Sequence, residues 1–160
     1  MKTFFVVFLL SAGLSLAADP PPQKEGLWSV HRQSADNTGK AKSDSTETVC
    51  RNHEYDKYLQ DKAKAAPGCK LLNSTFENSA LTVEMQCSVG NSDVKSKTVT
   101  TYQGDTASHT ESHSVYTPPL MGMTEVTMTM DQKYVSACAA GAKPGDITHA
   151  NGKVTNAWPH

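Results

Sequence analysis

The stretch 69-CKLLNSTFENSALTVEMQC-87 is bounded by two cysteines and predicts a β-hairpin in one specific register. If the chain turns about residues 77–79, four pairs of residues face each other, and each pair lies on the same side of the hairpin because side chains alternate along a strand. The pairs are Cys69 with Cys87, Leu71 with Met85, Asn73 with Val83, and Thr75 with Leu81. One register therefore explains both the cysteine positions and a largely apolar face, and it predicts a disulfide between the two ends.

The remaining cysteines, Cys50 and Cys138, then form the second predicted disulfide. An even number of cysteines in an exported chain is typical of disulfides, because the compartment is oxidising. A metal site built from all four thiolates is the alternative. No C-x-x-C pair is present to hold an ion, and we expect no metal site and no cofactor.

The N-terminus has the pattern of a secretory signal peptide over residues 1–18. Lys2 precedes an apolar run of about a dozen residues, and small residues follow at the cleavage positions. No later segment is long and apolar enough to cross a bilayer, so we expect no membrane span after cleavage. The chain is therefore expected to be periplasmic or secreted in a bacterium.

A proline-rich spacer at 19–24 precedes a single disulfide-linked β domain at 25–138. Strand-like segments rich in threonine alternate with turn residues, and only residues 51–68 have the pattern of a helix. This order predicts a mainly β fold: an antiparallel meander that forms a small barrel or curved sheet, with one short α-helix. Closure as a barrel is preferred because it pairs the first strand with the last. Residues 139–160 are polar and are expected to form a flexible tail.

The composition excludes one class of partner. The chain has 160 residues, a formal net charge of −1 and no basic cluster, so it lacks the electrostatic footprint of a nucleic-acid binder.

Several motifs, in this order, resemble the exported bacterial domain-of-unknown-function family thirty-six seventeen. They are "GLW" at Gly26–Trp28, "TVC" at Thr48–Cys50, the Cys69–Cys87 hairpin, "TVTTYQGD" at Thr98–Asp105, and the methionine- and threonine-rich strand that ends at Cys138. The resemblance spans about residues 24 to 138 and implies a periplasmic, mainly antiparallel β domain. It implies no activity and no functional residues.

The stretch "SHTESHSV" at 108–115 departs from that family, whose members carry a small residue and methionines there. On a strand, His109 and His113 are about 13 Å apart, too far to hold one ion together. Either histidine with Glu111 needs a further ligand from a neighbouring strand, and nothing in the sequence brings His31 or His53 close. We expect a solvated strand face, with a pH-dependent contact as the open alternative.

Methionines suggest a second kind of site, because thioethers are soft ligands that suit Cu(I). Met128 and Met130 alternate with threonines, as residues of an apolar face do. Met121 and Met123 lie in a loop flanked by proline and glycine and are less easily explained, but we assign none of the four as a metal ligand.

Three functions remain open. The preferred one is a monomeric, non-catalytic β-barrel module that binds an apolar or amphipathic small ligand, or an envelope protein, on its concave face. The alternative is a structural or interaction protein, such as an inhibitor of an exported enzyme or an envelope-stress component. A hydrolase is the weakest reading, because no nucleophile elbow or other catalytic motif is present, so no catalytic residue is assigned.

Overall fold

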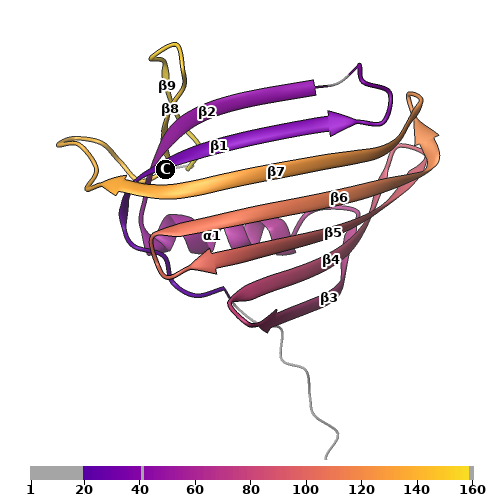
Figure 1. Ribbon diagram of the computed structural model, residues 1–160, viewed down its shortest axis with the longest axis horizontal. Helices are drawn as coiled ribbons and strands as arrows, with labels where there is room; N and C mark the ends of the chain where they lie inside the picture. Colours follow the sequence, from indigo (N-terminus) through magenta and orange to yellow (C-terminus); the bar gives the residue numbers. More distant parts are fainter. Residues whose placement is uncertain (1–19, 41, 159–160) are drawn as a thin grey trace, which may run out of the picture.

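The computed structural model describes residues 20–40 and 42–158, and the predicted signal peptide therefore lies outside the described residues. In this part of the chain nine strands form one antiparallel sheet, in the order β3-β4-β5-β6-β7-β1-β2-β8-β9, with one helix (Figure 1). The elements are β1 (Gly26–Asp36), β2 (Lys42–Arg51), α1 (His53–Lys64), β3 (Cys69–Glu77), β4 (Ala80–Val89), β5 (Ser92–Gln103), β6 (Ala107–Leu120), β7 (Met123–Ser136), β8 (Asp146–Thr148) and β9 (Val154–Asn156).

The predicted curved sheet is confirmed, but the sheet does not close into a barrel. The first strand does pair with the last long one, since β1 lies between β2 and β7. Closure would require β2 to pair with β3. Instead, α1 connects these two strands and lies behind the sheet in Figure 1, and β8 occupies part of the free edge of β2.

The two faces of the sheet differ in character. The helix-side face carries Trp28, Val30 and Val49, and the buried Tyr55 of α1 packs against the two valines. The opposite face, called the outer face below, carries His31 and other polar residues of the alternate positions. Asn52 caps the start of α1, and its side-chain oxygen accepts a hydrogen bond of 2.8 Å from the backbone N–H of Tyr55.

The glycine that opens the "GLW" motif has a steric explanation. Gly26 has a φ of 143°, and a Cβ atom there would lie 2.4 Å from the carbonyl oxygen of Ser136 on β7. The pairing of β1 with β7 also shifts its register between Leu27 and Trp28. The motif thus marks the place where the first strand presses closely on the seventh, and only glycine fits there.

Both predicted disulfides are present, between Cys69 and Cys87 and between Cys50 and Cys138. The predicted hairpin register is correct at the cysteine end, where Leu71 pairs with Met85. It is wrong by one residue at the other end, because the turn contains only Asn78 and Ser79, both at positive φ.

A β-bulge at Leu72 absorbs the one-residue difference in the hairpin. As a result Ser74 pairs with Val83 and Phe76 pairs with Leu81, instead of the predicted Asn73–Val83 and Thr75–Leu81 pairs. The shift brings Phe76 onto the helix-side face, so this face of the hairpin is more apolar than predicted.

The C-terminal segment differs from the flexible tail expected for residues 139–160. Two short strands form there, and Ile147 of β8 pairs with Val49 of β2. The ring of Trp158 lies 6.0 Å from that of Tyr55 and 6.4 Å from that of Tyr58. The reason is that β2 offers unpaired backbone groups beside an apolar cluster, which a short strand and one large aromatic side chain can cover.

Candidate functional site

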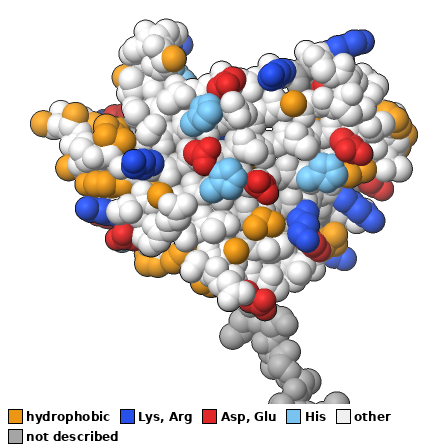
Figure 2. Space-filling model, viewed as in Figure 1, with side chains coloured by type: hydrophobic (Ala, Val, Ile, Leu, Met, Phe, Trp, Pro, Cys, Tyr) orange, Lys and Arg blue, Asp and Glu red, His pale blue; other side chains and the backbone are white. Residues whose placement is uncertain are grey.

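The stretch "SHTESHSV" lies within β6, and it is a strand as predicted. Its alternation places His109, Glu111 and His113 on the outer face, and Figure 2 shows histidine and acidic side chains intermixed over the middle of this face. The register with β7 sets Asp131 directly opposite His109, and the register with β1 sets His31 on the other side of Asp131. Three neighbouring strands therefore contribute a row of imidazole, carboxylate and imidazole.

His109 contacts two carboxylates. Its Nδ1 lies 2.7 Å from Oδ1 of Asp131, and its Nε2 lies 3.5 Å from Oε1 of Glu111. The hydrogen bond to Asp131 is the main reason that the pKa of the His109 imidazole is raised, and the contact with Glu111 adds to it. The neighbouring-strand group that the sequence reasoning lacked is therefore Asp131.

The other two histidines of this face have carboxylates of their own. His113 Nε2 lies 3.2 Å from Glu125, and His31 Nε2 lies 2.9 Å from Asp44. Gln33 donates to the second oxygen of Asp44, and this bond, followed by the one to His31, lowers the pKa of the Asp44 carboxyl. His53 is elsewhere, at the start of α1, where its Nε2 lies 2.9 Å from the carbonyl oxygen of Gln23.

This pairing decides what the outer face can do chemically. Each imidazole faces a different carboxylate, and within residues 20–40 and 42–158 no three histidine, cysteine or acidic side chains are grouped to hold a metal ion. The face is a set of exposed, hydrogen-bonded histidine–carboxylate pairs.

We expect the Asp131→Asn substitution to lower the pKa of His109 toward about 6.5, the ordinary histidine value. In the native protein the Asp131 carboxylate favours the imidazolium form of His109. This contribution to the stability of the fold is fully present below about pH 6.5 and is lost as the pH rises through the raised pKa of the folded state. The loss of stability at pH 5 should stay below about 1 kcal/mol, because the His109 side chain is 41% exposed. An NMR titration of the imidazole measures the pKa. Glu125→Gln, which touches His113 instead, is the control, and an unchanged His109 pKa in the Asp131 variant would contradict the assignment.

The outer face also contains a hollow of about 410 Å³ next to the histidine row. It is lined by Lys97, Val99, Glu111, His113, Thr127 and Thr129, and by Ser112 and Met128, which lie between these residues on β6 and β7. The ammonium of Lys97 lies 3.6 Å from Glu84, so this cation is engaged with a neighbouring strand. Lys97, Glu111 and His113 are thus each paired with a group that lies outside the hollow: Glu84, His109 and Glu125.

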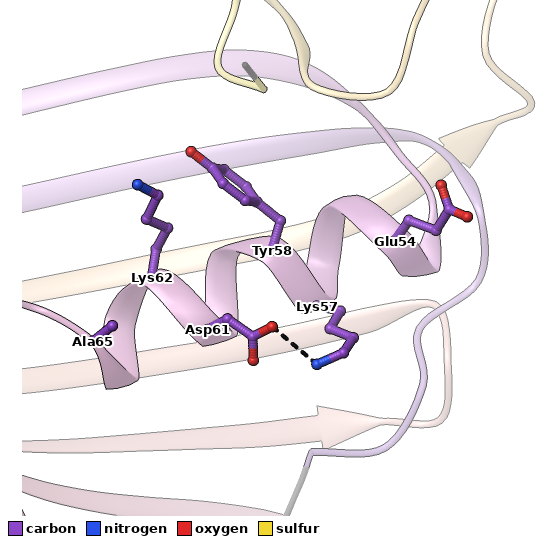
Figure 3. A pocket seen from close by; sticks show the side chains of 6 residues that line it. All are labelled: Glu54, Lys57, Tyr58, Asp61, Lys62 and Ala65. Carbon is purple, nitrogen blue, oxygen red and sulfur yellow. Dashed lines mark hydrogen bonds and ion pairs between the residues drawn. The ribbon is translucent and has the colours of Figure 1, made fainter. Parts of the chain in front are cut away.

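A second hollow, of about 480 Å³, lies along α1 (Figure 3). In Figure 3 Tyr58 and Lys62 project from one side of the helix, and the ammonium of Lys62 lies 5.5 Å from the centre of the Tyr58 ring. Lys57 and Asp61 form an ion pair of 2.9 Å on another side of the helix. Most of the lining residues are charged and exposed, which is typical of a solvated helix surface.

The helix-side face holds a set of half-exposed apolar side chains. Leu81, Val83 and Met85 line it from β4, and Val126 and Met128 line it from β7. Between these strands, β5 and β6 contribute hydroxyl groups that bond in pairs: Thr98 with Ser112 at 3.0 Å and Thr100 with Thr110 at 2.9 Å. The face therefore has apolar borders and a hydroxyl-lined centre.

One end of this face is buried and polar. Arg51 donates to Asp56 at 2.8 Å and to the side chain of Gln132 at 2.5 Å. Tyr102 lies in the same region, and burial raises the pKa of its phenol to about 12. Because the charges of Arg51 and Asp56 are matched, this end fixes the position of α1 against the sheet.

The methionines fall in two different environments. Met121 is 93% exposed in a two-residue turn, whereas Met128 and Met130 point to the helix-side face as their alternation predicted. The sulfur of Met130 is already contacted by Gln132 at 3.5 Å and by Arg32 at 3.8 Å. Met130 also packs against the cluster of Val30, Val49 and Tyr55.

Comparison with known protein families gave a match over most of the described domain. A family described as "Protein of unknown function (DUF3617)" matches residues 23–138. The match covers β1 to β7 and all four cysteines and ends before β8 and β9. A comparison with curated proteins gave no match.

Proposed function

This chain belongs to the family of proteins of unknown function DUF3617, as its motifs predict. We propose that it is an exported, non-catalytic binding module whose helix-side face holds an apolar or amphipathic ligand. Membership itself assigns no activity. The observation that carries the proposal is the combination of half-exposed apolar borders and a hydroxyl-lined centre on one face of the sheet. Ligand sites in proteins are mostly apolar, with a few polar groups that fix orientation.

The position of α1 supports this assignment. Tyr55 and Tyr58 pack over a cluster formed with Val30, Val49 and Met130, and among the described residues this cluster includes no side chain of β3 or β4. The apolar side chains of β4 therefore remain only half-buried although they lie on the face that carries the helix. A bound acyl chain or similar apolar group would cover them, and each buried CH₂ contributes about 0.8 kcal/mol.

Export is supported by the covalent structure. All four cysteines are paired in two disulfides, which persist in oxidising compartments. In residues 20–40 and 42–158 no helix is long and apolar enough to cross a membrane. Together with the signal-peptide pattern of residues 1–18, the two disulfides favour a periplasmic or secreted location.

A matched pair of valine substitutions tests which face binds. Val83 lies on the helix-side face of β4, and Val99 lies on the outer face of the adjacent β5, with comparable burial. We expect Val83→Asn to weaken binding of palmitate about tenfold or more, since it removes apolar contact area from the site. We expect Val99→Asn to change it less than about twofold.

Isothermal titration calorimetry with palmitate measures the affinity, and mass spectrometry of protein purified from its native host shows whether a lipid is retained. Wild-type protein that neither binds palmitate nor retains a lipid would overturn the proposal, as would equal losses in the two variants. Urea unfolding of both variants separates lost binding from lost stability.

A further inference from the structure

The strand β3 ends the sheet and exposes an apolar edge. The side chains of Leu71, Leu72 and Phe76 are 43%, 47% and 38% exposed. In the described part of the chain β3 pairs only with β4, so the backbone groups along its other edge have no partner strand. Natural edge strands are commonly protected by charged side chains, but residues 71–76, "LLNSTF", contain none. The other end of the sheet contrasts with this, since β8 covers part of β2 and the uncovered part carries Lys42 and Asp44.

The hairpin register shows which backbone groups of β3 face outward. Glu77 and Ala80 flank the two-residue turn, and such a flanking pair is hydrogen-bonded across the hairpin. Alternate residues of an antiparallel strand point their N–H and C=O groups to opposite edges. Ser74 and Phe76 therefore direct these groups away from β4, to the open edge.

We propose that two copies of this chain associate through β3, as an antiparallel pair about a two-fold axis at Ser74. At the axis, Ser74 of each copy faces Ser74 of the other, which lets their outward N–H and C=O groups form two hydrogen bonds. On either side of the axis, Asn73 of one copy faces Thr75 of the other. The bulge at Leu72 then adds one residue to the strand. As a result, the next two pairs between the copies are Leu71 with Phe76 and Lys70 with Glu77. A strand whose own residues match in this way is self-complementary, as a two-fold interface requires.

The side chains also match by face. Leu71 and Phe76 both lie on the helix-side face, because they pair with residues of β4 that lie on this face. Leu71 pairs with Met85, and Phe76 pairs with Leu81. Lys70 and Glu77 both lie on the outer face. The bulge at Leu72 is what allows this, because without it the apolar pair would lie on opposite faces. The same irregularity that shifts the hairpin register therefore makes the free edge self-complementary.

The association joins two sheets into one continuous sheet and covers the exposed leucine and phenylalanine of both copies. It also sets two Lys70–Glu77 ion pairs across the axis, which favour this register over shifted ones. The sequence alone predicts a monomer, and the open edge is the structural reason to propose a dimer instead. This inference does not depend on the proposed ligand, since Val83 and the other ligand-lining residues of β4 and β7 lie outside the edge.

Sedimentation velocity on protein with both disulfides formed tests the association, up to about 200 μM. We expect the wild-type protein to sediment as a dimer and Ser74→Pro to sediment as a monomer. Proline removes the outward N–H of residue 74 but none of the hydrogen bonds to β4. Far-UV circular dichroism shows whether this variant keeps its sheet.

Charge-reversal variants test the same association without changing the backbone. Lys70→Glu sets like charges opposite each other twice, and we expect it to weaken association at least about tenfold. The double variant Lys70→Glu/Glu77→Lys restores both pairs and is expected to recover the wild-type constant to within about threefold. Lys133→Glu on the central strand β7 is the matched control and should leave association unchanged. A monomeric wild type, a dimer that Ser74→Pro leaves intact, or a double variant no better than the single one would overturn the proposal.

Discussion

Replacement of Trp28 with alanine is expected to lower the free energy of unfolding by about 3–5 kcal/mol, a large share of the stability of a domain of this size. Trp28 is fully buried, with 0% of its surface exposed, and its indole N–H donates a 2.9 Å hydrogen bond to the carbonyl oxygen of Lys24. Tyr134 meets the ring edge-on at 6.1 Å, and the guanidinium of Arg51 lies 4.8 Å above it. The substitution removes all of these contacts at once and leaves a cavity at the end of the helix-side face where Arg51 lies.

Urea unfolding followed by circular dichroism measures this loss. The matched control is Trp158→Ala, because Trp158 is only partly buried against Tyr55 and Tyr58. We expect the control to lose less than half as much stability as the Trp28 variant. Equal losses would show that the C-terminal aromatic contact stabilises the domain as much as Trp28 does, and would contradict this prediction.

Removal of the Cys50–Cys138 disulfide by a double alanine substitution is expected to cost about 4–5 kcal/mol. The bond joins residues 88 apart in the sequence, and a cross-link over so long a loop strongly restricts the unfolded chain. It also ties the end of β2 to the segment that follows β7, on either side of β1.

The second disulfide supplies the comparison. Cys69 and Cys87 are 18 residues apart, so their removal is expected to cost less, about 3 kcal/mol. Free energies of unfolding of the two double variants, measured by denaturant titration, give the order directly. A larger loss for the Cys69–Cys87 variant would mean that native-state packing at the hairpin outweighs the loop-closure effect.

The hairpin illustrates what the sequence determines and where pattern reasoning stops. Cysteine positions and apolar alternation were sufficient to predict both disulfides and the pairing of Leu71 with Met85. The bulge at Leu72 could not be predicted, because both registers pair apolar residues and differ only in the length of the turn. A two-residue turn at Asn78 and Ser79, with its positive φ angles, decided between them.

Two further differences arise from contacts between distant segments. Asp131 could not be paired with His109 by counting from the turn, because the β6–β7 register shifts between Val115 and Leu120, where Pro118 and Pro119 lie. Barrel closure depends on whether the outermost strands meet, which local periodicity does not report. Strand, helix and cysteine predictions up to Cys138 rest on the sequence pattern and succeeded, whereas the two strands after Cys138, edge pairing and side-chain neighbours depend on the assembled sheet.

The place of β1 in the sheet has a consequence for the order of folding. Residues near the N-terminus pair with the strand that ends at Ser136, so the central ladder joins segments separated by most of the domain. Contacts of such high sequence separation slow folding, because a long loop must close before they form. For a chain that crosses a membrane from its N-terminus, as proposed, β1 emerges early, but its partner strand β7 emerges much later. The β1–β7 ladder, which joins the two parts of the sheet, can therefore form only late in translocation.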